Sequence, residues 1–268
     1  MENYNEYFSA NKDLWNQQTA IHRDSSFYNL AGFKAGENVL TAIELNELPD
    51  VKGKTMLHLQ CHFGMDSLNW ARLGADVTGV DLSDKAIKEA KQLNEELGMN
   101  AKFICSNVYD LKEHLDEKFD IVFTSYGTIG WLPDLDKWAG IVSYYLKPGG
   151  LFYIAEFHPV IWMFDDAFTH IKYYYNNREL IVTENQGTYT DTNHKSDIKG
   201  KEYSWNHGLS EVFMALIKAD LTIESFNEYM YSPYPCFSNT VETEKGQWQI
   251  KGMEGKIPMV YSVLAKKQ

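Results

Sequence analysis

The sequence has few positive charges for its length. Of 268 residues, 25 are Lys or Arg and 37 are Asp or Glu, which gives a formal net charge of −12 at pH 7. A surface of that sign repels the phosphate backbones of DNA and RNA. The charge balance therefore argues against nucleic acid as a partner and favours a small molecule as the substrate.

Cysteines and long apolar runs are scarce as well. The three cysteines, Cys61, Cys105 and Cys236, are odd in number and form no CxxC motif, which argues against a disulfide framework or a metal site. No uninterrupted apolar stretch approaches the roughly 18 residues of a membrane span. The polar, acidic start of the chain lacks the basic and apolar regions of a signal peptide. These absences predict a cytoplasmic protein with no membrane partner.

Regular alternation of short apolar segments and helical segments is present between residues 54 and 156. Residues 1–50 are predicted to be helical, including residues 37–48. Strands are then expected at 55–59, 75–82, 101–106, 119–125 and 151–157, with helices between most of them. Strands that alternate with helices are typical of a doubly wound, Rossmann-like parallel sheet.

The alternation ends after Glu156. Residues 157–205 are aromatic and polar, with strands expected at 170–175, 179–184 and 200–205 and a hairpin turn at Asn176-Asn177. This pattern predicts an antiparallel β insertion over the edge of the sheet. A helix at 209–220 and strands at 221–231 and 257–267 complete the expected order of elements.

The segment that links the first strand to its helix contains a single glycine, Gly64. Such a turn places backbone N–H groups at a helix N-terminus, where they bind polar or anionic groups. Asp81 ends the next strand, where a carboxylate accepts hydrogen bonds from both hydroxyls of a ribose. His62 and Phe63 occupy the space that the pyrophosphate of a dinucleotide needs, so the turn favours an adenosine cofactor without phosphates, such as S-adenosylmethionine.

At these residues the sequence resembles the class I S-adenosylmethionine-dependent methyltransferases, and in particular a subfamily that acts on small molecules. Residues 58–64 (HLQCHFG) are similar to the family's first motif, and Asp81 to its ribose-binding acid. Asn107 corresponds to a position that meets the adenine amino group and is often Asp. The resemblance covers about residues 53–156, with His58 and Gln60 standing where the family usually has an acid and a glycine.

The resemblance implies a seven-stranded, mostly parallel sheet with an antiparallel C-terminal strand. It implies that residues 1–50 form a helical lid on a methyltransferase domain at 51–268, in which 157–205 is the substrate-side β insertion. The residues that it assigns to the cofactor are Gln60, Cys61, His62, Gly64, Asp81, Leu82, Asn107, Val108, Ser125 and Tyr126.

The reaction that the family performs is in-line transfer of a methyl group, which needs a base only if the nucleophile must lose a proton. His158 and His207 are the candidate catalytic bases, because both are expected at the carboxyl edge of the sheet and imidazole titrates near neutral pH. Glu156 can be structural or functional. Trp131 and the aromatic segment 228–237 can line the substrate pocket or pack in the core.

Two other functions stay open. One is an NAD-dependent oxidoreductase, which the missing glycines and the apparently antiparallel C-terminal strands disfavour. The other is a protein that binds S-adenosylmethionine or its product S-adenosylhomocysteine without turnover. The sequence leaves the acceptor atom open between O, N, S and C, and carries no signal for an oligomeric state.

Overall fold

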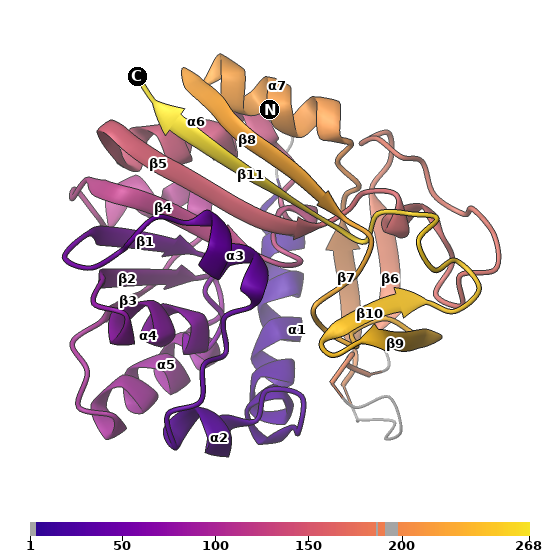
Figure 1. Cartoon of the computed structure of the whole chain (residues 1–268), viewed down its shortest axis with the longest axis horizontal. Coiled ribbons are helices and arrows are strands. Elements are labelled where there is room, and N and C mark those ends of the chain that lie inside the picture. Colours follow the sequence, from indigo (N-terminus) through magenta and orange to yellow (C-terminus); the bar gives the residue numbers. More distant parts are fainter. Residues whose placement is uncertain (1–3, 186, 191–197) are drawn as a thin grey trace.

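A seven-stranded sheet forms the centre of the molecule (Figure 1). The computed structural model describes residues 4–185, 187–190 and 198–268. The strand order is β3-β2-β1-β4-β5-β11-β8, and β11 runs antiparallel to both of its neighbours, β5 and β8. The strands are β1 (Thr55–Leu59), β2 (Asp76–Asp81), β3 (Lys102–Cys105), β4 (Phe119–Ser125), β5 (Leu146–Phe157), β8 (Leu221–Tyr229) and β11 (Val260–Lys267). The predicted fold class is confirmed.

Helices cover both faces of this sheet because successive strand residues point to opposite sides. On one face, Val122 and Phe152 pack with Trp138 and the helices α6 and α7. On the other face, Phe123 and Tyr153 belong to a core that also contains residues of α3 and α4. The helices are α1 (Asn5–Asp24), α2 (Leu30–Lys34), α3 (Ala42–Glu47), α4 (Met65–Arg72), α5 (Asp84–Glu96), α6 (Leu135–Tyr145) and α7 (Leu209–Lys218), with 3-10 turns η1 (Val108–Glu113), η2 (Ile129–Trp131) and η3 (Ile161–Met163).

Local capping determines where helices begin. The Ser83 hydroxyl accepts the backbone N–H of Ala86 at the start of α5, as the sequence indicates. The predicted helix over 37–48 is wrong in its first half, since α3 begins only at Ala42. Thr41 and Glu44 form a reciprocal capping box that fixes the helix start there.

The predicted β insertion is present as a two-stranded antiparallel sheet of β6 (Ile181–Asn185) and β7 (Gly200–Ser204). The third predicted strand, at 170–175, and the hairpin turn at Asn176-Asn177 are wrong. In that region Ile171 forms one isolated bridge, and the Tyr174 carbonyl accepts the side-chain amide of Asn206. A carbonyl bonded to a side chain is unavailable for a strand ladder, so the segment stays irregular.

A second small hairpin, of β9 (Thr240–Glu244) and β10 (Gln247–Ile250), lies next to the insertion (Figure 1). Its strands are short and the segment is rich in charge, so local patterns do not predict this hairpin. Gly246 has φ +74°, a left-handed conformation that suits glycine in the tight turn between the two strands.

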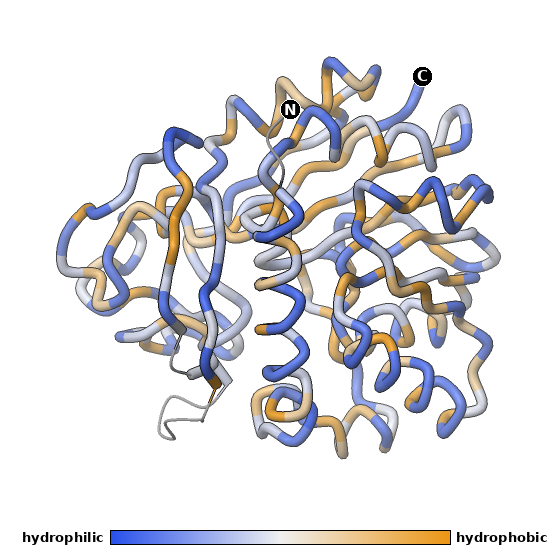
Figure 2. The backbone as a smooth tube through the Cα atoms, turned by 180° about the vertical axis from the view of Figure 1, so that it is seen from behind, coloured by the Kyte–Doolittle hydropathy of each residue, from blue (hydrophilic) through white to orange (hydrophobic). Residues whose placement is uncertain are grey.

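The N-terminal helix α1 runs lengthwise between the large sheet and the insertion (Figure 2). Asn11, which is buried, joins α1 to the edge of β7. Its amide donates to the Tyr203 carbonyl at 2.8 Å and accepts the Tyr203 N–H at 2.9 Å. The side chain thus pairs with the strand much as another strand would, which holds α1 against the insertion.

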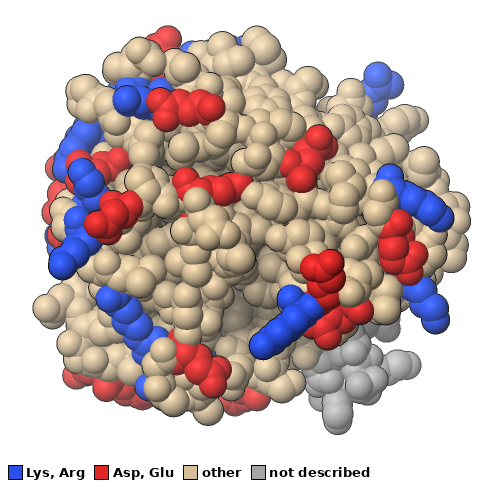
Figure 3. Space-filling model, in the orientation of Figure 1, with Lys and Arg blue, Asp and Glu red and all other residues tan. Residues whose placement is uncertain are grey.

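Positive and negative side chains are interspersed on the face seen in Figure 3, which shows no large basic patch. Within the described ranges, no helix has the length and apolarity needed to cross a membrane.

Candidate active site

A cavity of about 810 Å³ lies beyond the carboxyl ends of β1, β2, β4 and β5. The chain leaves β1 toward β2 and β3 on one side and returns to β4 and β5 on the other. The space between β1 and β4 is therefore a topological switch point, where ligands bind in open α/β sheets. Residues of α1, of the insertion and of the segment 234–237 form the other walls.

The loop after β1 has an alternating backbone conformation. Gln60, His62 and Gly64 have φ values of 57°, 50° and 81°, so every second residue is left-handed. A side chain at position 64 would clash, since a Cβ there would lie 2.7 Å from the ring of Phe103. The alternation turns the chain tightly into α4, and all five residues of the loop 60–64 line the cavity.

Asp81 ends β2 and is held from two sides. One carboxylate oxygen accepts the His62 N–H and the other accepts the Ser83 N–H, each at 2.8 Å. Burial raises the pKa of Asp81 to about 6, while these hydrogen bonds oppose the shift. Each oxygen keeps a free acceptor site, so the carboxylate can accept further donors from a ligand in the cavity.

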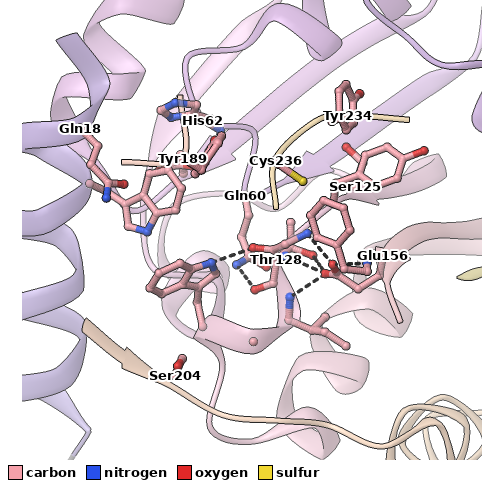
Figure 4. Close-up of a pocket in the computed structure, with 18 of the residues that line it drawn as sticks. Gln18, Gln60, His62, Ser125, Thr128, Glu156, Tyr189, Ser204, Tyr234 and Cys236 are labelled. Atoms are coloured by element: carbon pink, nitrogen blue, oxygen red, sulfur yellow. Dashed lines mark hydrogen bonds between the residues drawn. The ribbon is translucent and has the colours of Figure 1, made fainter. Parts of the chain in front are cut away.

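Gln60 leaves one polar atom without a partner. Its amide nitrogen donates to the Thr128 carbonyl at 2.8 Å (Figure 4). Its amide oxygen is buried, and no partner for it exists among the residues described. Since an unmade hydrogen bond of this kind is costly, the oxygen is available to a donor group of a ligand.

Glu156 has a structural position at the base of the cavity. Its carboxylate accepts the backbone N–H groups of Gly127, Thr128 and Ile129 and the hydroxyl of Thr128 (Figure 4). These bonds fix the loop between β4 and η2, and with it the Thr128 carbonyl that orients Gln60.

All ten residues assigned to the cofactor line this one cavity. Among them, Asn107 caps η1 by accepting the Tyr109 N–H at 3.0 Å. The Tyr126 hydroxyl donates to buried Glu44 at 3.0 Å. The structure thus brings the predicted residues together, from four strand ends that are far apart in the sequence.

Aromatic residues of α1 cover the loop. The Trp15 ring meets the rings of His62 and Trp131 edge-on, each at a centroid distance of 5.3 Å. His22 shares a hydrogen bond of 3.0 Å with His62, and its other nitrogen contacts the hydroxyl of Thr188 in the insertion. Burial lowers the pKa of His22 to about 3 and that of His62 well below its usual value, so both imidazoles are neutral at pH 7.

Of the two histidines predicted to act as bases, His207 lines the cavity and His158 does not. His158 is buried and is not among the cavity-lining residues; its Nε2 lies 3.0 Å from the Glu228 carboxylate. His207 lines the cavity, and its Nε2 bonds to the Leu132 carbonyl at 2.7 Å. Its Nδ1 lies 3.0 Å from Glu211 but makes no hydrogen bond to any described residue. The role of both histidines as bases stays a prediction.

The aromatic residues that were considered for the substrate pocket also differ in whether they line the cavity. Trp131, Tyr234 and Phe237 line the cavity. Tyr229 and Tyr231 do not, and the Tyr229 hydroxyl contacts Glu47 instead.

Sequence reasoning missed Asp66 and Tyr261. Asp66 lies in the first turn of α4, where its carboxylate accepts the Ser125 hydroxyl at 3.3 Å. The signal was present, because a residue two positions after Gly64 must lie near the same helix terminus. Tyr261 of β11 borders the cavity with a buried hydroxyl that has no partner in the described part of the chain. No local pattern marks it.

The fold and the site define an α/β protein with a crevice for an adenosine cofactor. The family model described as "Methyltransferase domain" matches residues 50–211, and the chain belongs to this family. The resemblance to the methyltransferases is thereby confirmed.

Curated relatives carry different methyl acceptors in their names. A phosphoethanolamine N-methyltransferase of Triticum aestivum is 32% identical over 112 residues, which is 41% of this chain and 22% of that protein. A ubiquinone biosynthesis O-methyltransferase of Chromobacterium violaceum is 33% identical over 100 residues, 37% of this chain and 43% of that protein. The chain thus aligns with less than half of either relative.

Among solved structures, a putative S-adenosylmethionine-dependent methyltransferase from Listeria monocytogenes superposes with a TM-score of 0.61. It is 22% identical and the match covers 84% of this chain and 96% of that one. This likeness shows that the fold is shared over most of both chains.

Proposed function

We propose that the protein transfers a methyl group from S-adenosylmethionine to a small molecule. The observation that carries this proposal is the loop 60–64, whose left-handed residues face the cavity directly beside the Asp81 carboxylate. The family membership, the S-adenosylmethionine-dependent structural neighbour and the net charge of −12 support it, as does the lack of a large basic patch on the face seen in Figure 3.

The residues present fit that cofactor. Asp81 offers acceptors to ribose hydroxyls, and the unpartnered oxygen of Gln60 offers one to an ammonium group such as that of a methionine moiety. Asn107 and Val108 line the wall at the end of β3, where an adenine would lie. The bound cofactor would supply an activated methyl group on a sulfonium ion.

The protein contributes to the reaction by enclosing the cofactor and the substrate and by orienting them toward each other. Residues 1–50 act as a lid through Trp15 and His22, and the insertion 157–205 closes the substrate side through Thr188. Excluding water and fixing the two reactants accounts for most of the barrier reduction in such a displacement. Both ring nitrogens of His158 are bonded, to Glu228 and to the Val160 N–H, which fits a reaction that relies on enclosure rather than on this histidine as a base.

The decisive experiment is calorimetric titration of the protein with S-adenosylmethionine and S-adenosylhomocysteine, followed by an assay for label transfer from methyl-labelled donor to a metabolite extract. Binding with transfer supports the proposal. Binding without transfer to any acceptor points to a non-catalytic binder, and lack of binding to either compound contradicts the proposal.

A further inference from the structure

The charged side chains among the described residues that line the cavity are acidic. Six carboxylates and no Lys or Arg occur among the described residues that line it: Glu37, Asp66, Asp81, Glu156, Asp166 and Glu202. Backbone N–H groups compensate Glu156 and Asp81, as described above. A phosphate or carboxylate on the substrate would meet repulsion in such a cavity without a cation to offset it.

Asp66 is the carboxylate best placed for a ligand. It lies where β4 ends, bonded to Ser125, and has no Lys, Arg or His ion-pair partner in the described ranges. Burial and the nearby Glu44 raise the pKa of Asp66 to about 7. The group is therefore a partly desolvated carboxylate that a cation would stabilise.

Three tyrosines, from three separate segments, line the same cavity as Asp66. Tyr28 follows α1, Tyr189 belongs to the insertion and Tyr234 follows β8, and the Asp66 carboxylate contributes to raising the pKa of each of these hydroxyls. The hydroxyls of Tyr28 and Tyr189 are hydrogen-bonded to each other at 2.5 Å. Tyr189 and Tyr234 are both seen in the close-up of the cavity (Figure 4). A carboxylate among aromatic rings is the environment that binds organic ammonium ions.

The hydroxyl of Tyr261 is an independent sign of a ligand in this cavity. Tyr261 is only 1% exposed, yet its hydroxyl has no hydrogen-bond partner within the described residues. A buried hydroxyl of this kind gains a hydrogen bond when a polar ligand occupies the cavity.

We propose that the methyl acceptor is an organic amine, held as a cation by Asp66 in the acidic, aromatic-lined cavity to which Tyr28, Tyr189 and Tyr234 contribute. This inference rests on the proposed function and narrows its substrate class. It excludes acceptors that carry a phosphate, or a carboxylate without an amine. It also assigns Asp66 to the binding of the acceptor, whereas the motif residues are assigned to the cofactor.

The first test is a set of matched aromatic compounds that share a skeleton and carry an amine, an alcohol or a carboxylate, such as 2-phenylethylamine, 2-phenylethanol and phenylacetate. Their binding to the protein saturated with S-adenosylhomocysteine is measured by calorimetry. We expect the amines to bind at least tenfold more tightly than the carboxylates. Equal or tighter binding of the carboxylates, or no binding of any amine in the set, overturns the inference.

The matched variants are Asp66→Asn and Asp66→Glu, with exposed Asp76→Asn as the control. Asp66→Asn is expected to weaken amine binding at least tenfold and to change the Kd of S-adenosylhomocysteine less than threefold, and Asp66→Glu to restore part of the amine affinity. If Asp66→Asn instead weakens S-adenosylhomocysteine and spares the amine, Asp66 holds the donor's own ammonium group and the inference fails. The proposed function is tested separately, by measuring whether the unchanged protein binds S-adenosylhomocysteine.

Fractionation of a metabolite extract gives a second, broader test. Extract is separated on cation- and anion-exchange resins before incubation with methyl-labelled donor. We expect the labelled product in the fraction that binds the cation exchanger, and its loss with Asp66→Asn. Label in the anionic fraction contradicts the inference while leaving methyl transfer itself supported.

Discussion

At the scale of single residues, Asp81 joins the loop 60–64 to the end of β2 and is the residue proposed to bind the ribose. Its carboxylate accepts the N–H groups of His62 and Ser83 and still has acceptor sites for a ribose. Removing a buried, charge-assisted acceptor costs a ligand about 1.5–3 kcal/mol.

Asp81→Ala is therefore expected to raise the Kd of S-adenosylhomocysteine at least tenfold, measured by calorimetry. Asp76→Ala, on the exposed opposite end of β2, is the control and leaves the Kd unchanged. An unaltered Kd in Asp81→Ala would place the adenosine elsewhere in the cavity.

The second prediction at this scale concerns Asp66 and pH. Its pKa is about 7 in the folded protein and about 3.9 in an unfolded chain. The folded state thus binds the proton more tightly, and the free energy of unfolding falls as the pH rises from about 4 to 7. Asp66→Asn removes this contribution.

The difference in Tm between Asp66→Asn and the unchanged protein should therefore be larger at pH 8 than at pH 5, by at least about 2 °C. Differential scanning calorimetry without ligand measures it, and Asp76→Asn is the control. A difference that is the same at both pH values would mean that Asp66 ionises normally in the fold.

At the scale of elements, α1 depends on one side chain for its position against β7. Asn11 makes both a donor and an acceptor bond with the Tyr203 backbone. Asn11→Ala leaves two backbone groups of a buried residue without these partners, which costs about 1–3 kcal/mol.

We expect Asn11→Ala to lower the Tm by several degrees and to increase amide hydrogen exchange in α1 and β7 together. Asp13→Ala, at an exposed position of the same helix, should change neither. Faster exchange confined to α1, with β7 unchanged, would show that the two elements are not joined by Asn11.

At the scale of the whole molecule, a ligand in the cavity must stabilise every element that borders it. The cavity is lined by residues of the large sheet's loops, of α1 and of the insertion, so a bound cofactor would contact all three. A ligand present at one hundred times its Kd adds about 2.7 kcal/mol to the free energy of unfolding.

S-adenosylhomocysteine at that excess is expected to raise the Tm by about 5–10 °C in a thermal-shift measurement. NAD at the same concentration should give no shift, because His62 and Phe63 fill the place of a pyrophosphate. A larger shift in Tm with NAD than with S-adenosylhomocysteine would favour the alternative function, an NAD-dependent oxidoreductase.

Local patterns in the sequence predicted most of the strands and helices, and the family resemblance predicted the mostly parallel sheet with its antiparallel C-terminal strand. Strand and helix periodicity follows from short-range sterics and burial, and a turn such as 60–64 lies next to the strand that positions it. Asp81 follows from the same logic, since parallel strands end at one edge. The errors at 37–41 and 170–175 arose where side chains of Glu44 and Asn206 took backbone partners, which periodicity does not reveal.

Only the tertiary structure decided which residues from distant segments share the cavity. Tyr28, Tyr189 and Tyr234 line it together with Asp66 because three irregular segments fold over the sheet edge, and no repeat or spacing in the sequence records that approach. The same packing joined His158 to Glu228 and left Tyr261 bordering the cavity without a partner. Contacts between distant loops depend on the packing of the whole chain. The sequence by itself therefore determined the class of fold and the residues at the ends of the strands, and only the tertiary structure decided which side chains face them across the cavity.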